Sequence, residues 1–146
     1  MGKRLLTLDS NVLIAALKAD EPYSDDCAEL VAKITDKFFL TEPSIVYVEV
    51  CGTLARRAGA EVAEAVRIEL DRIIHPRLLV DCDRDFCIST HRLCGEYGIY
   101  AIDALYLKVA LDSGATLVSL DKEDFIEKTR NGNHKVEAYH VSELPY

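Results

Sequence analysis

The sequence predicts an α/β fold in which helices cover both faces of a mostly parallel sheet. Short apolar runs typical of buried strands alternate along the chain with longer segments whose apolar residues recur at helical spacing. Consecutive strands joined by right-handed helical crossovers run parallel, which gives a three-layer α/β/α arrangement. We expect five strands in the order 3-2-1-4-5, so that the first and fourth strands are neighbours at the point where the strand order reverses.

The N-terminal strand ends at an acid. An apolar run from about Arg4 to Leu8 is followed by Asp9, and a helix is expected directly after it over about 11–17. Ser24 can cap the next helix, and the second strand is expected at 38–40. One apolar stripe marks the helix after Ser24: Cys27, Leu30, Val31 and Ile34.

Two helices follow the second strand. Pro43 favours a helix start and Gly59 a helix end, which predicts a helix over about 44–57. Its apolar residues are spread around the axis, which predicts heavy burial. The next helix is expected over 61–74, before Pro76 stops it. Its stripe consists of Val62, Val66, Leu70 and Ile73.

The second half of the chain repeats the alternation. Glycines end its two long helices, and Asp121 directly follows the strand at 116–120. A short helix containing Phe125 and Ile126 comes next, and the last strand is expected at the sheet edge. In chain order, the elements are a strand at 78–80, helices at 84–97 and from 101 to 114, and strands at 116–120 and 136–139.

Length and composition fit one soluble domain spanning residues 1–146. The 146 residues are 49% hydrophobic and 29% charged. No window reaches the roughly 18 apolar residues of a membrane span, and Asp9 interrupts the N-terminal apolar stretch, which excludes a signal peptide. We therefore expect a cytoplasmic protein without a membrane partner. Five cysteines, an odd number without a CxxC pair, indicate buried and reduced thiols.

The formal net charge of -8 argues against a protein that coats nucleic acid through a broad basic surface. It is compatible with a nuclease, because a metal site built from acids adds negative charge and its ion restores attraction to phosphate.

Four acids stand where the pattern leads us to expect an apolar residue or where a strand tip meets a helix. The tips carrying Asp9 and Asp121 belong to neighbouring strands, Glu49 lies in the apolar helix 44–57, and Asp103 begins another apolar helix. Carboxylates that converge without a cation repel one another, and oxygen ligands of this kind suit Mg²⁺ or Mn²⁺. The absence of histidine from the set argues against zinc.

The motifs around these acids are Asp9-Ser10-Asn11-Val12-Leu13, Val48-Glu49-Val50, Ile102-Asp103-Ala104-Leu105 and Ser119-Leu120-Asp121-Lys122-Glu123-Asp124-Phe125. Their order and intervals resemble those of PIN-domain ribonucleases, in particular the VapC toxins of toxin–antitoxin pairs. The resemblance implies a PIN-like fold and Mg²⁺- or Mn²⁺-dependent cleavage of RNA. It also implies a homodimer and inhibition by a VapB-like antitoxin in the active-site groove.

The resemblance assigns roles to individual residues. Asp9, Glu49, Asp103 and Asp121 would be the catalytic, metal-binding quartet. Asn11 and Ser119 match small polar positions that support the quartet through hydrogen bonds, and Asp124 matches a position that joins the site in some members.

Each acid also has a purely structural interpretation. Asp9 and Asp121 could cap helices, Glu49 could pair with Arg56 or Arg57, and Asp103 could be stabilised by the helix dipole. Asp124 could be an exposed acid in a first helical turn. A separate face with Cys87, His91 and Cys94, together with Cys82, could be a metal cluster, although core packing is favoured.

Other functions are less consistent with the sequence. A haloacid-dehalogenase-type phosphohydrolase needs a second Asp where this chain has Asn11, and a response-regulator receiver needs paired acids and a late Lys that are absent. A PIN-domain RNA-processing nuclease outside a toxin–antitoxin pair and a non-catalytic interaction module with the same fold remain alternatives.

Overall fold

The computed structural model describes residues 2–132 and 136–146. Its main sheet contains β1 (Arg4–Leu8), β2 (Phe38–Leu40), β5 (Thr116–Ser119) and β6 (Ala138–His140) in the order β2-β1-β5-β6. Every pair in this sheet is parallel, and Leu6 of β1 lies opposite both Leu40 and Thr116. The predicted α/β class, the parallel pairing and the adjacency of the first and fourth strands are therefore confirmed.

The strand expected third in the chain, at 78–80, does not join this sheet. Residues 78–80 contribute β4 (Leu79–Val80), which pairs with β3 (Glu42–Pro43) in a separate two-stranded sheet. The backbone ladder reaches Thr41, whose N–H donates to Leu6 O over 2.9 Å. Beyond it, the N–H of Leu8 is taken by the Glu42 side chain at 2.6 Å. The prediction of one five-stranded sheet was thus wrong, because a buried side chain replaces the ladder and the chain turns toward β4.

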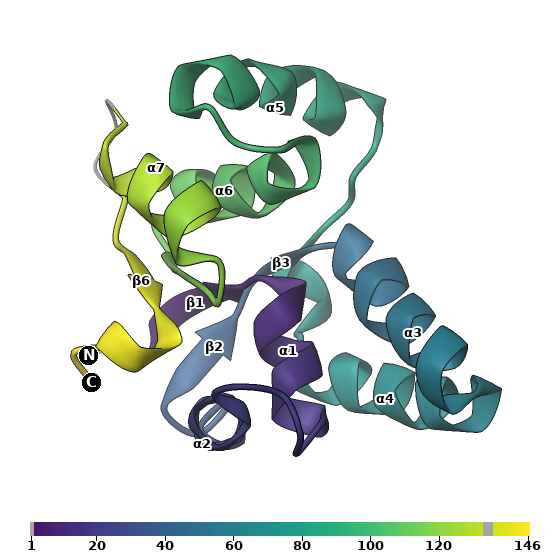
Figure 1. The fold of residues 1–146 in the computed structure, drawn as a ribbon. Coiled ribbons are helices and arrows are strands. Elements are labelled where there is room, and N and C mark those ends of the chain that lie inside the picture. The colour runs from purple at the N-terminus through teal and green to yellow at the C-terminus, as the bar shows by residue number, and fades with distance from the viewer. Residues whose placement is uncertain (1, 133–135) are drawn as a thin grey trace.

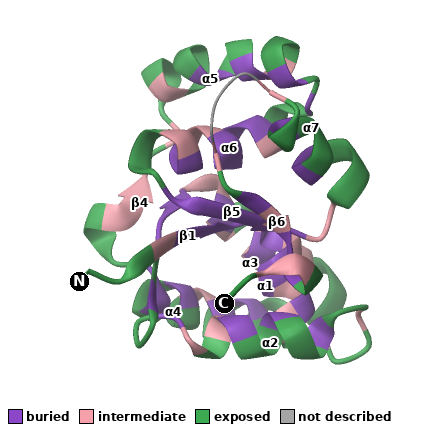
Figure 2. Ribbon diagram, turned by 90° about the vertical axis from the view of Figure 1, so that its left-hand side faces the viewer, coloured by how far each residue is buried: buried purple, intermediate pink, exposed green. Residues whose placement is uncertain are grey.

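The helices lie close to their predicted positions and form two layers around the sheet. Helices α1 to α4 cover one face, whereas α6 and α7 cover the other and α5 lies outside α6 (Figures 1 and 2). Among the described residues, none of the helices is long and apolar enough to cross a membrane. Their bounds are α1 (Ser10–Leu17), α2 (Ser24–Ala32), α3 (Ile45–Ala58), α4 (Ala60–Ile73), α5 (Arg84–Tyr97), α6 (Ala101–Ser113) and α7 (Glu127–Arg130), with short turns η1 (Pro76–Leu78), η2 (Lys122–Ile126) and η3 (Val141–Glu143).

The core is the interface between the sheet and its flanking helices. Leu6 and Leu8 of β1 and Leu117 of β5 are fully buried, as are Tyr106 and Leu107 of α6. Burial of such side chains contributes about 1.5–3 kcal/mol each. The strands that end at the candidate site are thereby fixed from both faces (Figure 2).

Helix α3 is less buried than its sequence predicts. It contacts α1 and α4, and its buried side chains lie on one stripe, Val46, Val50 and Leu54. Val48 is 63% exposed, and Glu49 is partly exposed rather than enclosed. The apolar residues spread around α3 misled the prediction, because only one side of the helix meets the core.

Candidate functional site

The parallel pairing of β1 and β5 brings their carboxyl-terminal ends together, as expected at a topological switch point. The Asp9 N–H donates to Val118 O over 2.9 Å, which holds the end of β1 against β5. The Asp9 side chain is only 5% exposed, and one of its oxygens accepts a hydrogen bond from the Ser119 hydroxyl at 2.7 Å. Although Asp9 is the N-cap residue of α1, its side chain makes no capping hydrogen bond.

Ser119 and Asn11 form a small network around Asp9. The Ser119 oxygen accepts hydrogen bonds from Asn11 Nδ2 at 3.2 Å and from the Asp121 N–H at 3.0 Å. Asn11 also accepts from the Leu120 N–H through its side-chain oxygen at 3.2 Å. Because a serine hydroxyl has one proton and two lone pairs, Ser119 is fully used and its proton is directed at Asp9. The network fixes the orientation of the Asp9 carboxylate.

Glu49 and Asp103 approach from two helices on opposite layers. The hydroxyl of Tyr106, in α6, donates to Glu49 Oε1 in α3 over 2.7 Å. Asp103 lies in the first turn of α6 and is half-buried. The salt bridge considered for Glu49 is not among the ion pairs of the described residues, where Arg57 pairs with Glu21 at 3.4 Å. Glu49 is thus held by a neutral donor.

Asp121 and Asp124 form the more exposed side. Asp121 caps the turn η2, since its side chain accepts from the Asp124 N–H at 3.1 Å. The Asp124 carboxylate pairs with Lys128 at 3.8 Å, and its side chain is 56% exposed. The capping interpretation therefore describes Asp121 correctly, which does not prevent its second carboxylate oxygen from facing a ligand.

The four acids act on one another electrostatically. Burial, together with the charges of Asp103 and Glu49, raises the pKa of Asp9 from 3.8 to about 7, despite the opposing hydrogen bond from Ser119. Burial and the charges of Asp121, Glu49 and Asp124 raise the pKa of Asp103 to about 6. The charge of Glu49 thus acts on both Asp9 and Asp103.

A fifth acid, Glu42, was missed by the sequence reasoning. It is fully buried, its Oε1 accepts from the Leu8 N–H, and its Oε2 has no hydrogen-bond partner in the described structure. Burial raises the pKa of Glu42 well above its ordinary value, and the charges of Asp9 and Glu49 add to this. An acid immediately before Pro43, at the end of an apolar strand, was the available signal.

The carboxylate oxygens of the four acids are chemically suited to a hard divalent cation. Carboxylate oxygens are the ligands that Mg²⁺ and Mn²⁺ prefer, and a cation would relieve the repulsion that raises the pKa values of Asp9 and Asp103. Within residues 2–132 and 136–146, however, no three His, Cys, Asp or Glu side chains are arranged so that they could already hold a metal ion. Binding therefore requires these side chains to draw closer together.

Among the described residues, the cysteine- and histidine-containing face of α5 forms no metal cluster, and only Cys94 of this face packs against the core. Cys87 and His91 are exposed, and the helix buries Thr90, Leu93 and Tyr97 instead. All five cysteines are free, as expected, but only Cys27 is fully buried. The expectation of buried thiols was wrong for Cys87, which is exposed on α5, a helix that lies outside α6 (Figure 1).

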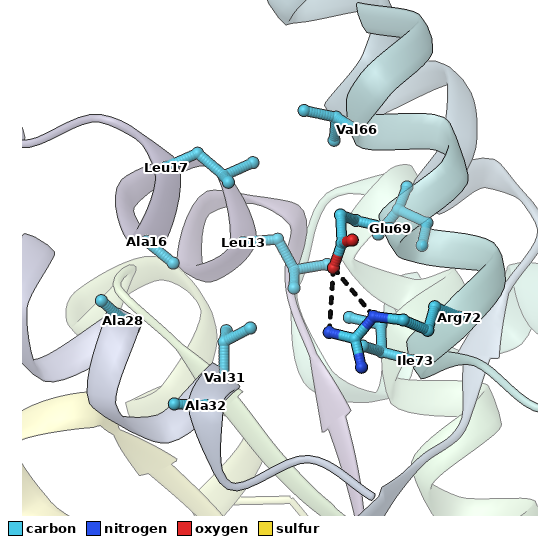
Figure 3. Close-up of a pocket in the computed structure, with 11 residues that line it drawn as sticks. Leu13, Ala16, Leu17, Ala28, Val31, Ala32, Val66, Glu69, Arg72 and Ile73 are labelled. Atoms are coloured by element: carbon cyan, nitrogen blue, oxygen red, sulfur yellow. Dashed lines mark hydrogen bonds and ion pairs between the residues drawn. The ribbon is translucent and has the colours of Figure 1, made fainter.

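A separate apolar pocket of about 240 Å³ lies between α1, α2 and α4. Leu13 and Leu17 face Val31 and Val66 across it, and the ion pair of Glu69 with Arg72 lies at its side (Figure 3). None of the quartet lines this pocket, so its chemistry is that of an apolar contact surface.

Comparison with known proteins gives consistent matches. The PIN domain family matches residues 6–131. The chain is 32% identical to ribonuclease VapC7 of Mycobacterium tuberculosis over 127 residues, which are 80% of this chain and 82% of that protein.

Solved structures share the fold at low sequence identity. VapC20 of Mycobacterium tuberculosis, a sarcin–ricin loop cleaving toxin, is 15% identical with a TM-score of 0.66, covering 87% of this chain and 95% of that one. DNA-bound VapBC from Salmonella typhimurium is 14% identical with a TM-score of 0.66, covering 96% and 99%. VapBC-1 from nontypeable Haemophilus influenzae is 15% identical with a TM-score of 0.65, covering 95% and 99%.

Proposed function

The chain belongs to the PIN-domain family, with a VapC ribonuclease among its relatives, and from this premise we propose that it is a metal-dependent endoribonuclease of the VapC type. The proposal treats residues 1–146 as one PIN domain. The observation that carries it is that the charges of Glu49 and Asp103 act on Asp9, and those of Glu49 and Asp121 on Asp103, although the four acids come from different parts of the chain.

The quartet would hold Mg²⁺ or Mn²⁺, with Asp124 as an additional outer acid. When bound, such an ion lowers the pKa of a water molecule and stabilises the negative charge that develops on the phosphate during hydrolysis. Ser119 and Asn11 hold the Asp9 carboxylate in one orientation. The acids also repel an RNA phosphate until a cation neutralises them, so the chain itself makes substrate binding depend on the metal.

RNA cleavage by the purified chain tests this function. We expect cleavage of RNA with Mn²⁺ or Mg²⁺, its loss in EDTA, and a loss of about a hundredfold or more in Asp9→Asn, since even an outer-shell partner of a metal contributes about 10–100-fold. Asp85→Asn is the matched control, because the Asp85 side chain is 89% exposed on α5. Undiminished cleavage by Asp9→Asn, or activity that survives EDTA, would contradict the proposal.

The partner of this nuclease is proposed to be a VapB-like antitoxin, and the chain is proposed to form a homodimer. Antitoxin complexes are among the proteins that share its fold, and the pocket between α1, α2 and α4 offers apolar walls to a partner side chain. Co-expression with a small DNA-binding protein encoded beside it should give a stable complex without RNase activity. Sedimentation showing only monomer at micromolar concentrations would refute the dimer, and full activity in the presence of that protein would point to an RNA-processing nuclease outside such a pair.

A further inference from the structure

Tyr106 occupies an unusual position for a tyrosine. Its side chain, in α6, is fully buried, where a phenylalanine would fill nearly the same space. Burial of a hydroxyl is unfavourable unless it is hydrogen-bonded. The hydroxyl donates its proton to Glu49 Oε1 at 2.7 Å, and the charges of Glu42, Glu49 and Asp9 all act on it. The ring serves the core, but the hydroxyl is directed at the acids.

We infer that Tyr106 is a positioning residue that fixes Glu49 Oε1 through its hydroxyl and leaves Oε2 as the oxygen that meets the metal. This inference rests on the proposed metal-dependent function. No hydrogen bond to Glu49 Oε2 is formed within the part of the chain that the structure describes. Partners in the outer shell that orient a ligating side chain are a general feature of metal sites.

The chemical type of the donor supports this role. A lysine or arginine beside Glu49 would also hold its carboxylate, but the positive charge would compete with a divalent cation for the same oxygens. A tyrosine hydroxyl is neutral and has one proton to donate. It therefore restricts the rotation of Glu49 without neutralising the charge that the metal needs. Glu49 is partly exposed and has a flexible side chain, so this hydrogen bond removes much of the conformational freedom of its carboxylate.

Helix α3, which contains Glu49, also contains a matched control. Tyr47 of α3 donates its hydroxyl to Asp71 Oδ1 of α4 at 2.6 Å, a tyrosine–carboxylate hydrogen bond of the same kind. Neither Tyr47 nor Asp71 belongs to the candidate site. Tyr106→Phe and Tyr47→Phe thus each remove one hydroxyl that donates to a carboxylate. Only in Tyr106→Phe is that carboxylate proposed to bind metal.

The test is calorimetric titration of the full chain with Mn²⁺, with and without these substitutions. We expect Tyr106→Phe to raise the Kd for Mn²⁺ about tenfold, and Tyr47→Phe to leave it unchanged. In RNA cleavage, the Mn²⁺ concentration for half-maximal activity should rise with Tyr106→Phe, while kcat at saturating Mn²⁺ stays close to that of the wild type.

The outcomes separate this inference from the function on which it rests. If the wild type does not bind Mn²⁺, the proposed function fails. If the wild type binds and Tyr106→Phe binds equally well, only the role of Tyr106 is refuted. Equal weakening by Tyr47→Phe would also refute it, because the effect would then be a general loss of rigidity. Circular dichroism at 4 °C serves as the folding check, and an unfolded Tyr106→Phe chain would overturn the inference by showing that the hydroxyl is needed for folding.

Discussion

The inner and outer parts of the candidate site differ in their relation to the fold. The inner acids, Asp9 at the end of β1 and Glu42 in β3, are buried and have raised pKa values. The outer acids, Asp121 and Asp124, lie at the start of η2, where a capping bond and an ion pair with Lys128 accommodate them. The local structure thus accommodates the charged outer acids, whereas burial disfavours the charged form of the inner acids.

This difference indicates which acids the fold itself would not require. An Asp or Glu at a helix start is favoured by the exposed N–H groups there, so its presence alone says little about function. A buried carboxylate with a raised pKa is destabilising at neutral pH. The inner acids are therefore stronger indicators of ligand binding, because functional sites are where local rules of stability are broken.

The largest effect on stability is expected from Asp9→Asn. The folded pKa of about 7 exceeds the ordinary value of 3.8, so the native state binds more protons than the unfolded state between those values. The stability contribution of Asp9 therefore falls as pH rises from about 4 to 7 and stays low above it. Removing the charge should raise the free energy of unfolding in EDTA by about 2–4 kcal/mol at pH 8 and hardly at all at pH 4.

Chemical denaturation in EDTA at both pH values measures this gain, and Mn²⁺ should offset most of it. At a hundred times its Kd, a ligand stabilises the folded state by about 2.7 kcal/mol, and the variant should lack this stabilisation. Asp85→Asn should behave like the wild type in both conditions. Equal stability of Asp9→Asn and wild type at pH 8 would show that Asp9 is not under electrostatic stress.

A smaller gain of the same sign is expected from Glu42→Gln. The pKa of Glu42 is raised above 4.5 mainly by burial, and the Leu8 N–H opposes the shift. By the same linkage, the contribution of Glu42 to the free energy of unfolding falls as pH rises above about 4.5, until its folded pKa is reached. The amide keeps an oxygen for Leu8, so the free energy of unfolding should increase at pH 8. The increase should be smaller than in Asp9→Asn, because burying the amide NH₂ is itself unfavourable.

Glu29→Gln provides the comparison for this variant, since Glu29 is exposed in α2 and such changes usually stay within about 0.5 kcal/mol. The difference between the two variants should disappear at pH 4. A Glu42→Gln chain that is less stable than the wild type at pH 8 would mean that the acid serves as a structural link between β1 and β3.

The strand tips could be predicted because short-range patterns determine them. An apolar run that ends at an acid before a helix placed Asp9 and Asp121 correctly, and the switch-point rule made their strands neighbours. Helix ends were equally local, as Gly98 and Gly114 have positive φ angles of 69° and 70° that favour glycine. Each of these features depends on a few consecutive residues.

The remaining features depend on contacts between segments far apart in the sequence. The side chain of Glu42 accepts the hydrogen bond from the Leu8 N–H that a backbone carbonyl of the sheet would otherwise accept, and the expected sheet is split there. The residues next to Glu42 in the sequence do not indicate this contact with Leu8. The bond from Tyr106 to Glu49 joins α6 to α3 across 57 positions. The exposure of Val48 and of Cys87 likewise follows from which side of a helix meets the core.

The smallest effect is expected from Asp124→Asn, which tests whether Asp124 belongs with the quartet. Its exposed carboxylate makes a 3.8 Å ion pair with Lys128, and the capping bond to Asp121 uses its backbone N–H, which the substitution keeps. Stability should change by less than about 0.5 kcal/mol, and the Kd for Mn²⁺ by less than about threefold, or roughly 0.6 kcal/mol.

Asp121→Asn is the matched variant: asparagine caps as well as aspartate, so stability should again be kept, but Mn²⁺ binding should be lost. Calorimetry on both variants measures the contrast, and a tenfold or greater loss in Asp124→Asn would make Asp124 a fifth metal ligand and move it from the outer group into the binding site.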